Sequence, residues 1–355
     1  MPSVLLPGVN GRDPVSERAL VSAFRSALEG HELVESPASP FRASLSALGR
    51  HADAVVVAGC DLFAGTSYGP AMAAALTSPV HGPLTKGSNR FRRPLALVGV
   101  SAGVPMRPSE RWAARRLVRR ADLVLLSDGD SASRLAGAGV PSPMRVAADP
   151  AWLSLVPAAS GPVSTRSVLV ALDANVEQSV KLELFLGLNE LGAQGVRVDL
   201  LPWAGRGTSD FAFAERLALD LRAQGRLADI IPPAGDLAGV TESMAEAGAV
   251  VALRYRAIHA AAAAGVPVVG IAVENRIRAL TRRLGQVCLP RAEFGASLAS
   301  TVLNAADSSA PSPAVVKEEV ARAEAGLALL RLVLEHGDLE TADLEGLPLA
   351  PDPWL

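Results

Sequence analysis

Cysteine is scarce in this sequence. The 355 residues include two, Cys60 and Cys288, which lie far apart and form no C-x-x-C pair. A disulfide framework or a zinc site is therefore not expected, and the cysteine content fits a reducing cytosol.

Long apolar runs are lacking as well. No stretch reaches the roughly 20 apolar residues that a membrane-spanning helix needs. The N-terminal sequence MPSVLLPGVNGRD has neither a basic segment nor a long apolar one, so it does not resemble a signal peptide. We expect a soluble, cytoplasmic protein, and peripheral contact with the inner face of the membrane is left open.

The chain has no excess of positive charge. Its formal net charge is −2, which gives no electrostatic reason to expect a nucleic-acid partner. Lysine is almost absent, since Lys86, Lys181 and Lys317 are the three lysines among 34 basic residues. Arginine is by far the commoner basic residue in this chain. A single position where a related sequence has lysine and this one has arginine is therefore weak evidence of a change in function.

The composition that is present suits a globular protein. The chain is 49% hydrophobic and 20% charged, and its length is natural for two domains. Short apolar runs alternate with helical patterns, and the alternation restarts after VPAASGPVSTR, which is rich in proline, serine and glycine. We predict an N-terminal domain at 1–158, a C-terminal domain at 165–312, and a C-terminal helix and tail at 313–355.

Buried apolar strands that alternate with amphipathic helices are typical of parallel, doubly wound sheets. We therefore predict an α/β fold with two tandem Rossmann-like domains. Ligands of such sheets bind beyond the carboxyl ends of the strands, so a cleft between the domains is the expected site. The predicted strands are 3–9, 31–37, 52–63, 93–103, 121–129, 167–173, 196–203, 227–233, 247–253, 266–273 and 286–290.

The segment RYRAIH gives the strongest signal for a site. Arg254 and Arg256 follow an apolar strand, and His259 comes one helical turn later. A guanidinium group matches the shape of a carboxylate or phosphate, and residues three apart share a helix face. Arg276 follows the next apolar run in the corresponding place. This pattern favours an anion-binding site, and the alternative is that these arginines are solvated or paired with surface acids.

Other strand ends give weaker signals. The first strand ends in a glycine turn around Asn10, which suits an anion near a helix N-terminus. Small residues around Gly59 would let backbone approach a ligand. Asp128 and Ser131 follow a strand and begin a helix, and Asp149 precedes a proline. Turns and helix caps account for each of these residues equally well.

The order of these segments resembles the polysaccharide pyruvyl transferase family over about residues 8–290. The segments GVNGRDPVSERAL, LVGVSAGVP and SDGDSASRLAGAGV are similar to family segments, and AADPAWLSL matches closely at Asp149. The most specific family element is Arg-Leu-His, followed by a small-residue helix and a GVP segment. Arg254, Tyr255 and Arg256 stand at its first three positions.

The resemblance implies a GT-B-like fold and a transferase. Family members move the enolpyruvyl group of phosphoenolpyruvate to a sugar hydroxyl of a cell-surface polysaccharide precursor, forming a pyruvate ketal and releasing phosphate. No metal or organic cofactor is implied. The implied partners are phosphoenolpyruvate and a sugar or lipid-linked saccharide acceptor. The donor has a carboxylate and a phosphate, which suit arginine, and the reaction needs an acid for the methylene carbon and a base for the hydroxyl.

Three charged positions differ from the family pattern. Arg256 stands where the family has histidine, Arg276 where it has lysine, and Ser127 where it has arginine. Arginine stays protonated and cannot serve as the acid, so His259 becomes the candidate acid. Asp210 resembles a family acidic position and is the candidate base. A helix N-cap is the alternative for Asp210, and packing on a helix face is the alternative for His259.

These differences leave two other functions open. One is a GT-B-like glycosyltransferase that uses another donor, and the other is a catalytically inactive binding relative. The predicted site consists of His259 and Asp210 for catalysis and of Arg254, Arg256, Arg276, Asn10, Gly59, Asp128, Ser131 and Asp149 for substrate binding.

Overall fold

The chain divides into two compact units, each built on one six-stranded sheet. Unit 1 contains Leu20–Leu153 and Glu319–Leu355 together with the first residues, and unit 2 contains Asp13–Ala19 and Ser154–Glu318. A computed structural model describes residues 2–7, 14–36, 52–58, 62–63, 70, 73, 94–103, 106–140, 144–155, 164–232, 235–307 and 310–336.

The sheet of unit 1 is parallel throughout and has the order β2-β1-β3-β4-β5-β6. The chain starts at β1, adds β2 on one side, and then adds the remaining strands on the other side. The elements of this unit are β1 (Ser3–Pro7), α1 (Pro14–Ala27), β2 (Glu32–Ser36), β3 (Ala54–Ala58), β4 (Leu95–Val100), α4 (Pro108–Val118), β5 (Leu123–Leu126), α5 (Gly129–Gly137), β6 (Arg145–Val146), the 3-10 helix Pro150–Ser154 and α12 (Pro313–His336). The first residues of α1, to Ala19, and of α12, to Glu318, are grouped with unit 2.

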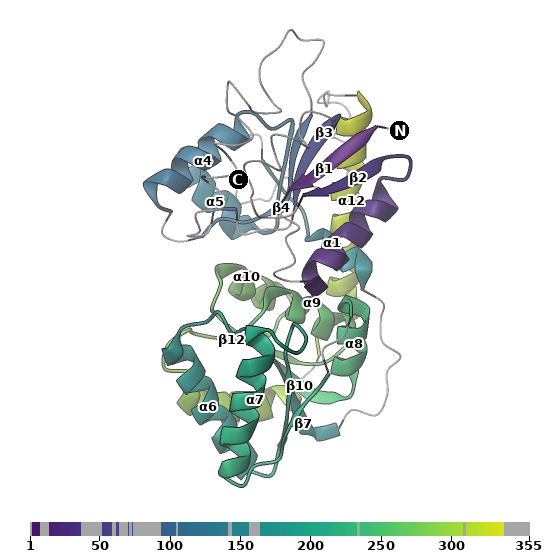
Figure 1. Cartoon of the computed structure of the whole chain (residues 1–355). Helices are drawn as coiled ribbons and strands as arrows, with labels where there is room; N and C mark the ends of the chain where they lie inside the picture. The colour runs from purple at the N-terminus through teal and green to yellow at the C-terminus, as the bar shows by residue number, and fades with distance from the viewer. Residues whose placement is uncertain are drawn as a thin grey trace. The chain divides into compact units, whose positions relative to one another are not determined.

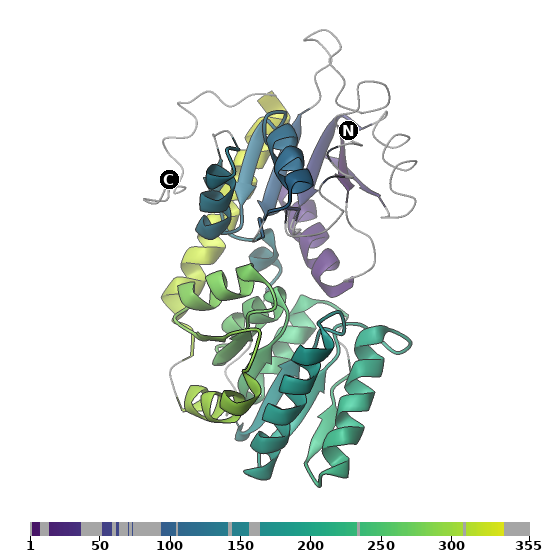
Figure 2. The ribbon, with the colours of Figure 1, turned by 90° about the vertical axis from the view of Figure 1, so that its left-hand side faces the viewer.

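Helices cover both faces of this sheet (Figures 1 and 2). Side chains of a strand point alternately to the two faces. Val55 and Val57 of β3 pack with residues of α4 and α5, whereas Ala54 and Val56 pack with residues of α1 and α12. Each strand is therefore buried on both sides, which explains why these strands are almost continuously apolar in the sequence.

The long C-terminal helix belongs to the core of unit 1. The sequence predicts a helix over about 313–336, and α12 has these bounds. Leu329, Leu330 and Val333 are completely buried against the same face of the sheet as Phe24 of α1. The prediction set 313–355 apart from both domains, but the contacts group the chain from Glu319 with the first one. None of the helices that the structure describes is both long and apolar enough to cross a bilayer.

The sheet of unit 2 is also parallel and has the order β12-β11-β10-β7-β8-β9. The first strand, β7, lies in the middle; two strands follow on one side of it, and β10 then begins the other side. This reversal between β7 and β10 is a topological switch point. The elements are β7 (Ser164–Ala171), α6 (Gln178–Ala193), β8 (Arg197–Leu201), α7 (Ser209–Ala223), β9 (Ala228–Ile230), α8 (Leu237–Ala245), β10 (Ala247–Ala252), α9 (Tyr255–Ala263), β11 (Val268–Ile271), α10 (Asn275–Arg283), β12 (Val287–Leu289) and α11 (Gly295–Ala306).

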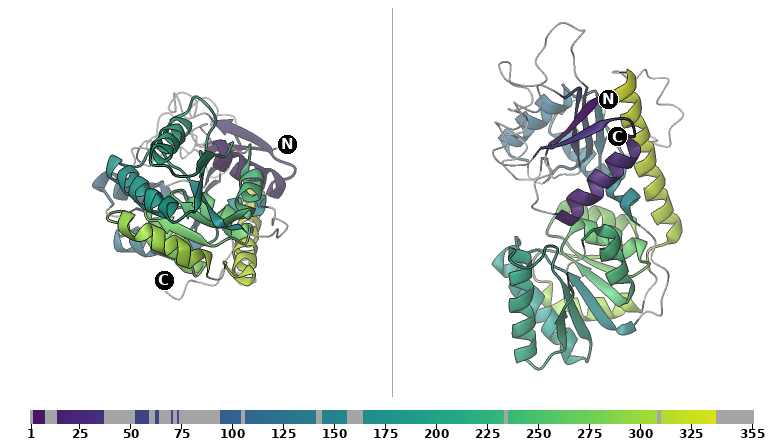
Figure 3. Two further views of the ribbon diagram at one scale, coloured as in Figure 1. Left: turned by 90° about the horizontal axis from the view of Figure 1, so that it is seen from below. Right: turned by 45° about the vertical axis from the view of Figure 1, so that its right-hand side comes forward.

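Unit 2 is layered in the same way. Helices α6, α7 and α11 share a core with one face of the sheet, and the left view of Figure 3 shows them along one side of it. Helices α8, α9 and α10 contact β10, β11 and β12. Cys288 in β12 is a free thiol. Partial burial raises its pKa, so the thiol stays protonated near neutral pH.

Helices α6 and α11 approach each other at glycines. A Cβ atom on Gly187 would lie 2.6 Å from Leu298 Cβ and 3.0 Å from the Gly295 carbonyl oxygen. One on Gly295 would lie 2.8 Å from the Glu183 carbonyl oxygen. Such distances leave no room for a methyl group, so small residues at these two positions set the spacing of the helices beside β7 and β10.

We predict that Gly187→Ala lowers the stability of the protein by about 2 kcal/mol, because the added methyl group overpacks the α6–α11 contact. The control is Gly137→Ala at the end of α5, where nothing lies within 4 Å of the added atom. That change should be neutral or stabilise by about 0.5 kcal/mol through helix propensity. Urea denaturation followed by circular dichroism measures both, and equal effects would contradict the packing argument.

Candidate functional site

The register of the second sheet brings two strand ends together. Ala171 of β7 pairs with Ala252 of β10 across the switch point, and two residues further along the chain come Asp173 and Arg254. Both therefore leave the carboxyl edge of the sheet side by side. In open α/β sheets this is the position where ligands bind.

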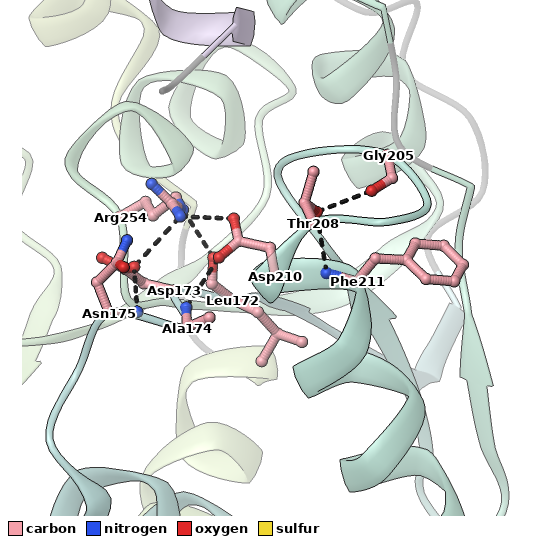
Figure 4. A network of polar contacts seen from close by, with 9 residues as sticks. All are labelled: Leu172, Asp173, Ala174, Asn175, Gly205, Thr208, Asp210, Phe211 and Arg254. Atoms are coloured by element: carbon pink, nitrogen blue, oxygen red, sulfur yellow. Dashed lines mark hydrogen bonds and ion pairs between the residues drawn. The ribbon is translucent and has the colours of Figure 1, made fainter. Parts of the chain in front are cut away.

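Arg254 occupies the N-cap position of α9 and is held by three neighbours (Figure 4). Its Nε donates to the Leu172 carbonyl oxygen at 2.7 Å. Its Nη2 donates to Asp210 Oδ2 at 2.6 Å and to Asp173 Oδ1 at 3.2 Å. We refer to Asp173, Asp210 and Arg254 as the switch-point cluster.

Asp210 ties a neighbouring loop to this cluster. It lies in the first turn of α7, where a negative charge interacts favourably with the helix dipole. Its Oδ1 accepts a hydrogen bond from Ala174 N–H at 2.9 Å, so both carboxylate oxygens are engaged. The N-cap of α7 is Thr208, whose Oγ1 accepts from Phe211 N–H at 3.3 Å. The interpretation of Asp210 as an N-cap is therefore wrong.

The cluster is largely buried and combines one arginine with two carboxylates. The side chains of Arg254 and Asp173 are each 14% exposed and that of Asp210 is 6% exposed. Asp173 Oδ1 also accepts from Asn175 N–H at 2.9 Å, and the Arg254 guanidinium lies 5.9 Å from the ring centre of Trp203. In Figure 4 one terminal nitrogen of Arg254 points away from both carboxylates. That edge of the guanidinium faces away from the acids that orient it.

A second group of side chains adjoins the cluster along α9. The ring of Tyr255 meets the ring of His259 edge-on, with centroids 4.6 Å apart and planes at 81°. The guanidinium of Arg276 lies 4.6 Å from the centre of the Tyr255 ring, and its Nε donates to Glu274 Oε2 at 2.6 Å. We refer to His259, Tyr255 and Arg276 as the Tyr255 stack. It fixes Arg276 by a cation–π contact on one side and a carboxylate on the other.

His259 lies entirely inside this arrangement. Its side chain has no exposed surface, and Nδ1 is 3.1 Å from the Tyr255 carbonyl oxygen. A carbonyl oxygen accepts hydrogen bonds and never donates them, so Nδ1 must have the proton. Arg256 is also buried, at 7% exposure. The role of His259 as an acid stays a prediction, and direct contact with a substrate would require its exposure.

A family model described as polysaccharide pyruvyl transferase matches residues 17–275. This is most of the chain, and it includes the whole switch-point cluster. The chain belongs to the polysaccharide pyruvyl transferase family. Arg276, at the outer end of the Tyr255 stack, lies one residue beyond the matched range. A search of curated proteins found no match to the sequence.

Solved structures show the fold of this pyruvyl transferase family member. The Methanocaldococcus jannaschii UDP-GlcNAc 2-epimerase in complex with UDP-GlcNAc and UDP has a TM-score of 0.61 at 12% identity, covering 94% of this chain and 99% of that one. The Staphylococcus aureus MnaA–UDP structure has a TM-score of 0.60 at 12% identity, with 94% and 97% coverage. Anabaena Alr3699/HepE in complex with UDP and glucose has a TM-score of 0.58 at 12% identity, with 94% and 100% coverage. The predicted GT-B-like fold of two Rossmann-like domains is confirmed.

Asp128 and Ser131 form a helix cap in unit 1. Asp128 is the N-cap of α5, and its Oδ1 accepts from Ser131 N–H at 2.7 Å. Its Oδ2 accepts from the hydroxyl groups of Ser131 at 2.8 Å and of Ser127 at 2.9 Å. The Ser131 hydroxyl oxygen accepts in turn from Ala102 N–H at 3.0 Å. Capping therefore accounts for these contacts, and substrate binding by either residue stays a prediction.

Asp149 is the remaining predicted residue that the structure describes in unit 1, and substrate binding by it stays a prediction. Asp149 is 1% exposed, and its Oδ1 accepts from Ala151 N–H at 2.8 Å at the start of the 3-10 helix. This is the turn that the sequence indicates as an alternative. Asn10 and Gly59 lie outside the described residues. Of the predicted set, the structure therefore joins Arg254 with Asp210 directly, and it places Arg256, His259 and Arg276 on the adjoining helices α9 and α10.

Sequence reasoning missed two acids of this site. Asp173 was visible as the polar residue that ends the apolar run SVLVALD. Glu274 was visible as the residue two positions before Arg276. The arginines drew attention to the anion they could bind, although buried arginines are usually paired within the protein. Arg254 and Arg276 do pair with acids, but these acids are partly or largely buried and not the surface acids of the alternative. Binding of an anion by either arginine stays a prediction.

We predict that Asp210→Asn destabilises the protein by about 3 kcal/mol, because it removes one partner of a buried ion pair. The matched control is Asp220→Asn on the same helix. Asp220 also pairs with an arginine, Arg216, but its side chain is 41% exposed, so its loss should cost about 0.5 kcal/mol or less. Denaturant midpoints measure both variants. Equal effects would show that the cluster does not stabilise unit 2.

We further predict a coupling of about 1 kcal/mol between Tyr255 and Arg276, since a partly buried cation–π pair is worth that much. A double-mutant cycle of Tyr255→Leu and Arg276→Gln measures this coupling from denaturation free energies. Tyr255→Phe keeps the ring and should retain the coupling. Additive effects of the leucine and glutamine changes would contradict the proposed stack.

Proposed function

We propose that the protein is an active pyruvyl transferase, which moves the enolpyruvyl group of phosphoenolpyruvate to hydroxyl groups of a sugar in a cell-surface polysaccharide precursor. The acceptor would be a free or lipid-linked saccharide, and the reaction would take place in the cytoplasm. The family assignment supports the transferase class. The observation that carries the proposal is the fixed guanidinium of Arg254 at the switch point of the second sheet.

The donor explains why a site of this kind would use several arginines. Phosphoenolpyruvate has a carboxylate and a phosphate close together, and one guanidinium can pair with each group. Arg254 is oriented by Asp173, Asp210 and the Leu172 carbonyl oxygen, so it would lose little side-chain entropy on binding. Arg276 is likewise held in place, by a hydrogen bond to Glu274 and a cation–π contact with Tyr255. In this proposal Arg254, Arg256 and Arg276 bind the donor.

The chemistry has two stages that balance in protons. A first sugar hydroxyl adds to C2 of the donor, while a proton is added to the methylene carbon. A second hydroxyl then displaces phosphate by cleavage of the C2–O bond, which closes the ketal. Asp210 is the proposed base, and Asp173 is a second carboxylate at the same strand edge. Asp173 is the more accessible of the two, with 14% of its side chain exposed against 6% for Asp210.

A glycosyltransferase reaction is the second candidate. The solved structures of similar fold include proteins in complex with UDP, UDP-GlcNAc and UDP-glucose, and the switch point of a Rossmann-like sheet is a common nucleotide site. A third outcome is a relative that binds ligand without turnover. These candidates differ in the ligand that they bind and in the release of phosphate, so one set of assays separates them.

We predict that the wild-type protein binds phosphoenolpyruvate in calorimetry and that Arg254→Lys weakens this binding by about tenfold or more, because lysine cannot form a bidentate pair. Arg216→Lys is the control, since Arg216 is 75% exposed and pairs with Asp220, which is not part of the cluster. Thermal denaturation shows whether each variant is folded. If Arg254→Lys does not fold, Arg276→Lys serves as a second variant.

Phosphate release from phosphoenolpyruvate, followed by phosphorus NMR with a panel of saccharides, tests turnover. No donor binding by the wild-type protein would overturn the proposal. A melting temperature raised by a UDP-sugar but unchanged by phosphoenolpyruvate would favour the glycosyltransferase. Donor binding without release on any acceptor would favour the binding relative.

A further inference from the structure

Helix α4 of unit 1 has an unusual concentration of arginine. Residues 107–120 include six arginines and one acid, Glu110, whereas the formal charge of the whole chain is −2. Glu110 is 1% exposed, and its Oε2 accepts from Arg107 N–H at 2.8 Å, so the one acid of the segment is turned inward. The surface of this helix is therefore strongly positive. The arginines are Arg107, Arg111, Arg115, Arg116, Arg119 and Arg120.

The arginines and one tryptophan share the solvent face of the helix. Ala113, Ala114, Leu117 and Val118 are buried in the core of unit 1, so the opposite side faces outward, away from the sheet (Figures 1 and 2). That side presents an exposed set at the spacing of one helix face. We call this set the α4 basic face: Arg111, Trp112, Arg115, Arg116 and Arg119.

Three arginines of this face, Arg111, Arg115 and Arg119, keep their charge without a carboxylate partner among the described residues. Arg111 Nε donates to the Met106 carbonyl oxygen at 3.2 Å, and Arg115 Nη2 donates to the Ala138 carbonyl oxygen at 2.7 Å. Carbonyl oxygens are neutral, so these contacts orient the guanidinium groups and leave their charge in place.

Trp112 lies in the middle of these arginines with 47% of its surface exposed. The Arg116 guanidinium is 5.5 Å from the centre of its ring, so the indole is held at the surface and does not fold into the core. An indole prefers the boundary between water and lipid headgroups, where its ring is partly apolar and its N–H is solvated. Arginine on a surface helix is attracted to anionic lipids, and an exposed tryptophan beside it can sit at the level of the headgroups.

We propose that the α4 basic face is a docking surface for anionic phospholipid headgroups, which places unit 1 on a membrane surface. The arginines supply the attraction and Trp112 supplies a shallow anchor. This proposal does not depend on the donor or on the reaction in unit 2. A nucleic acid would also be attracted by the arginines, but it would not require an exposed indole among them.

Sedimentation of the full chain with lipid vesicles tests the proposal. We expect the wild-type protein to bind vesicles of phosphatidylcholine with phosphatidylglycerol, not to bind phosphatidylcholine alone, and to be released by salt. Arg111→Gln/Arg115→Gln/Arg119→Gln should reduce the partition coefficient by about 100-fold, at about fivefold for each arginine near an anionic surface. Trp112→Ala should reduce it by a smaller factor while leaving the salt dependence unchanged.

The matched control neutralises three exposed arginines elsewhere, Arg25→Gln/Arg216→Gln/Arg222→Gln, with the same change in net charge. It should bind vesicles like the wild type. The proposal is overturned if the wild type binds neither vesicle, if the α4 triple variant binds like the wild type, or if both triple variants lose binding equally. Duplex DNA that displaces the protein from vesicles at low concentration would assign the face to nucleic acid instead. Trp112→Ala, a change at a single side chain that is 47% exposed, gives a second variant that tests the face if the α4 triple variant does not fold.

Discussion

The ion pairs of Arg254 with Asp173 and Asp210 hold together the edge of the second sheet where a ligand would bind. They connect the end of β7, the start of α7 and the start of α9, which are three segments distant in the sequence. The geometry arises from the parallel register of β7 and β10, which puts residue 173 beside residue 254. A buried charge is tolerated only when its partners are correctly placed, so this edge has one well-defined arrangement.

The same contacts limit the chemistry that is available. Arg254 donates some of its hydrogen bonds to acids of the protein itself, and Arg276 donates one to Glu274. An anion that binds here, as we propose, would meet guanidinium groups that are already oriented and partly compensated in charge. Such a site would select an anionic ligand by its shape more than by its net charge. A cluster of solvated cations would select mainly by charge.

The sequence predicts the architecture well because the signals are local. Apolar runs between helical patterns identify all six strands of the second sheet, and the composition of the last helix gives the bounds of α12. The cap formed by Asp128 follows from short-range rules. The switch-point cluster could not be predicted in the same way, because the partners of Arg254 are chosen by the order and register of strands. Likewise, the burial of His259 depends on which face of α9 meets the sheet, and the alanines around it leave that face undefined in the sequence.

Because α12 completes the core of unit 1, the second unit is an insertion between two parts of the first. The ribosome therefore releases all strands and helices of unit 2 before it releases Leu329, Leu330 and Val333, which cover one face of the first sheet. Every strand of unit 2 is therefore synthesised while one face of the first sheet still lacks its covering helix. Apolar surface that stays exposed during synthesis favours aggregation, so the sheet of unit 1 is the more vulnerable of the two in that interval.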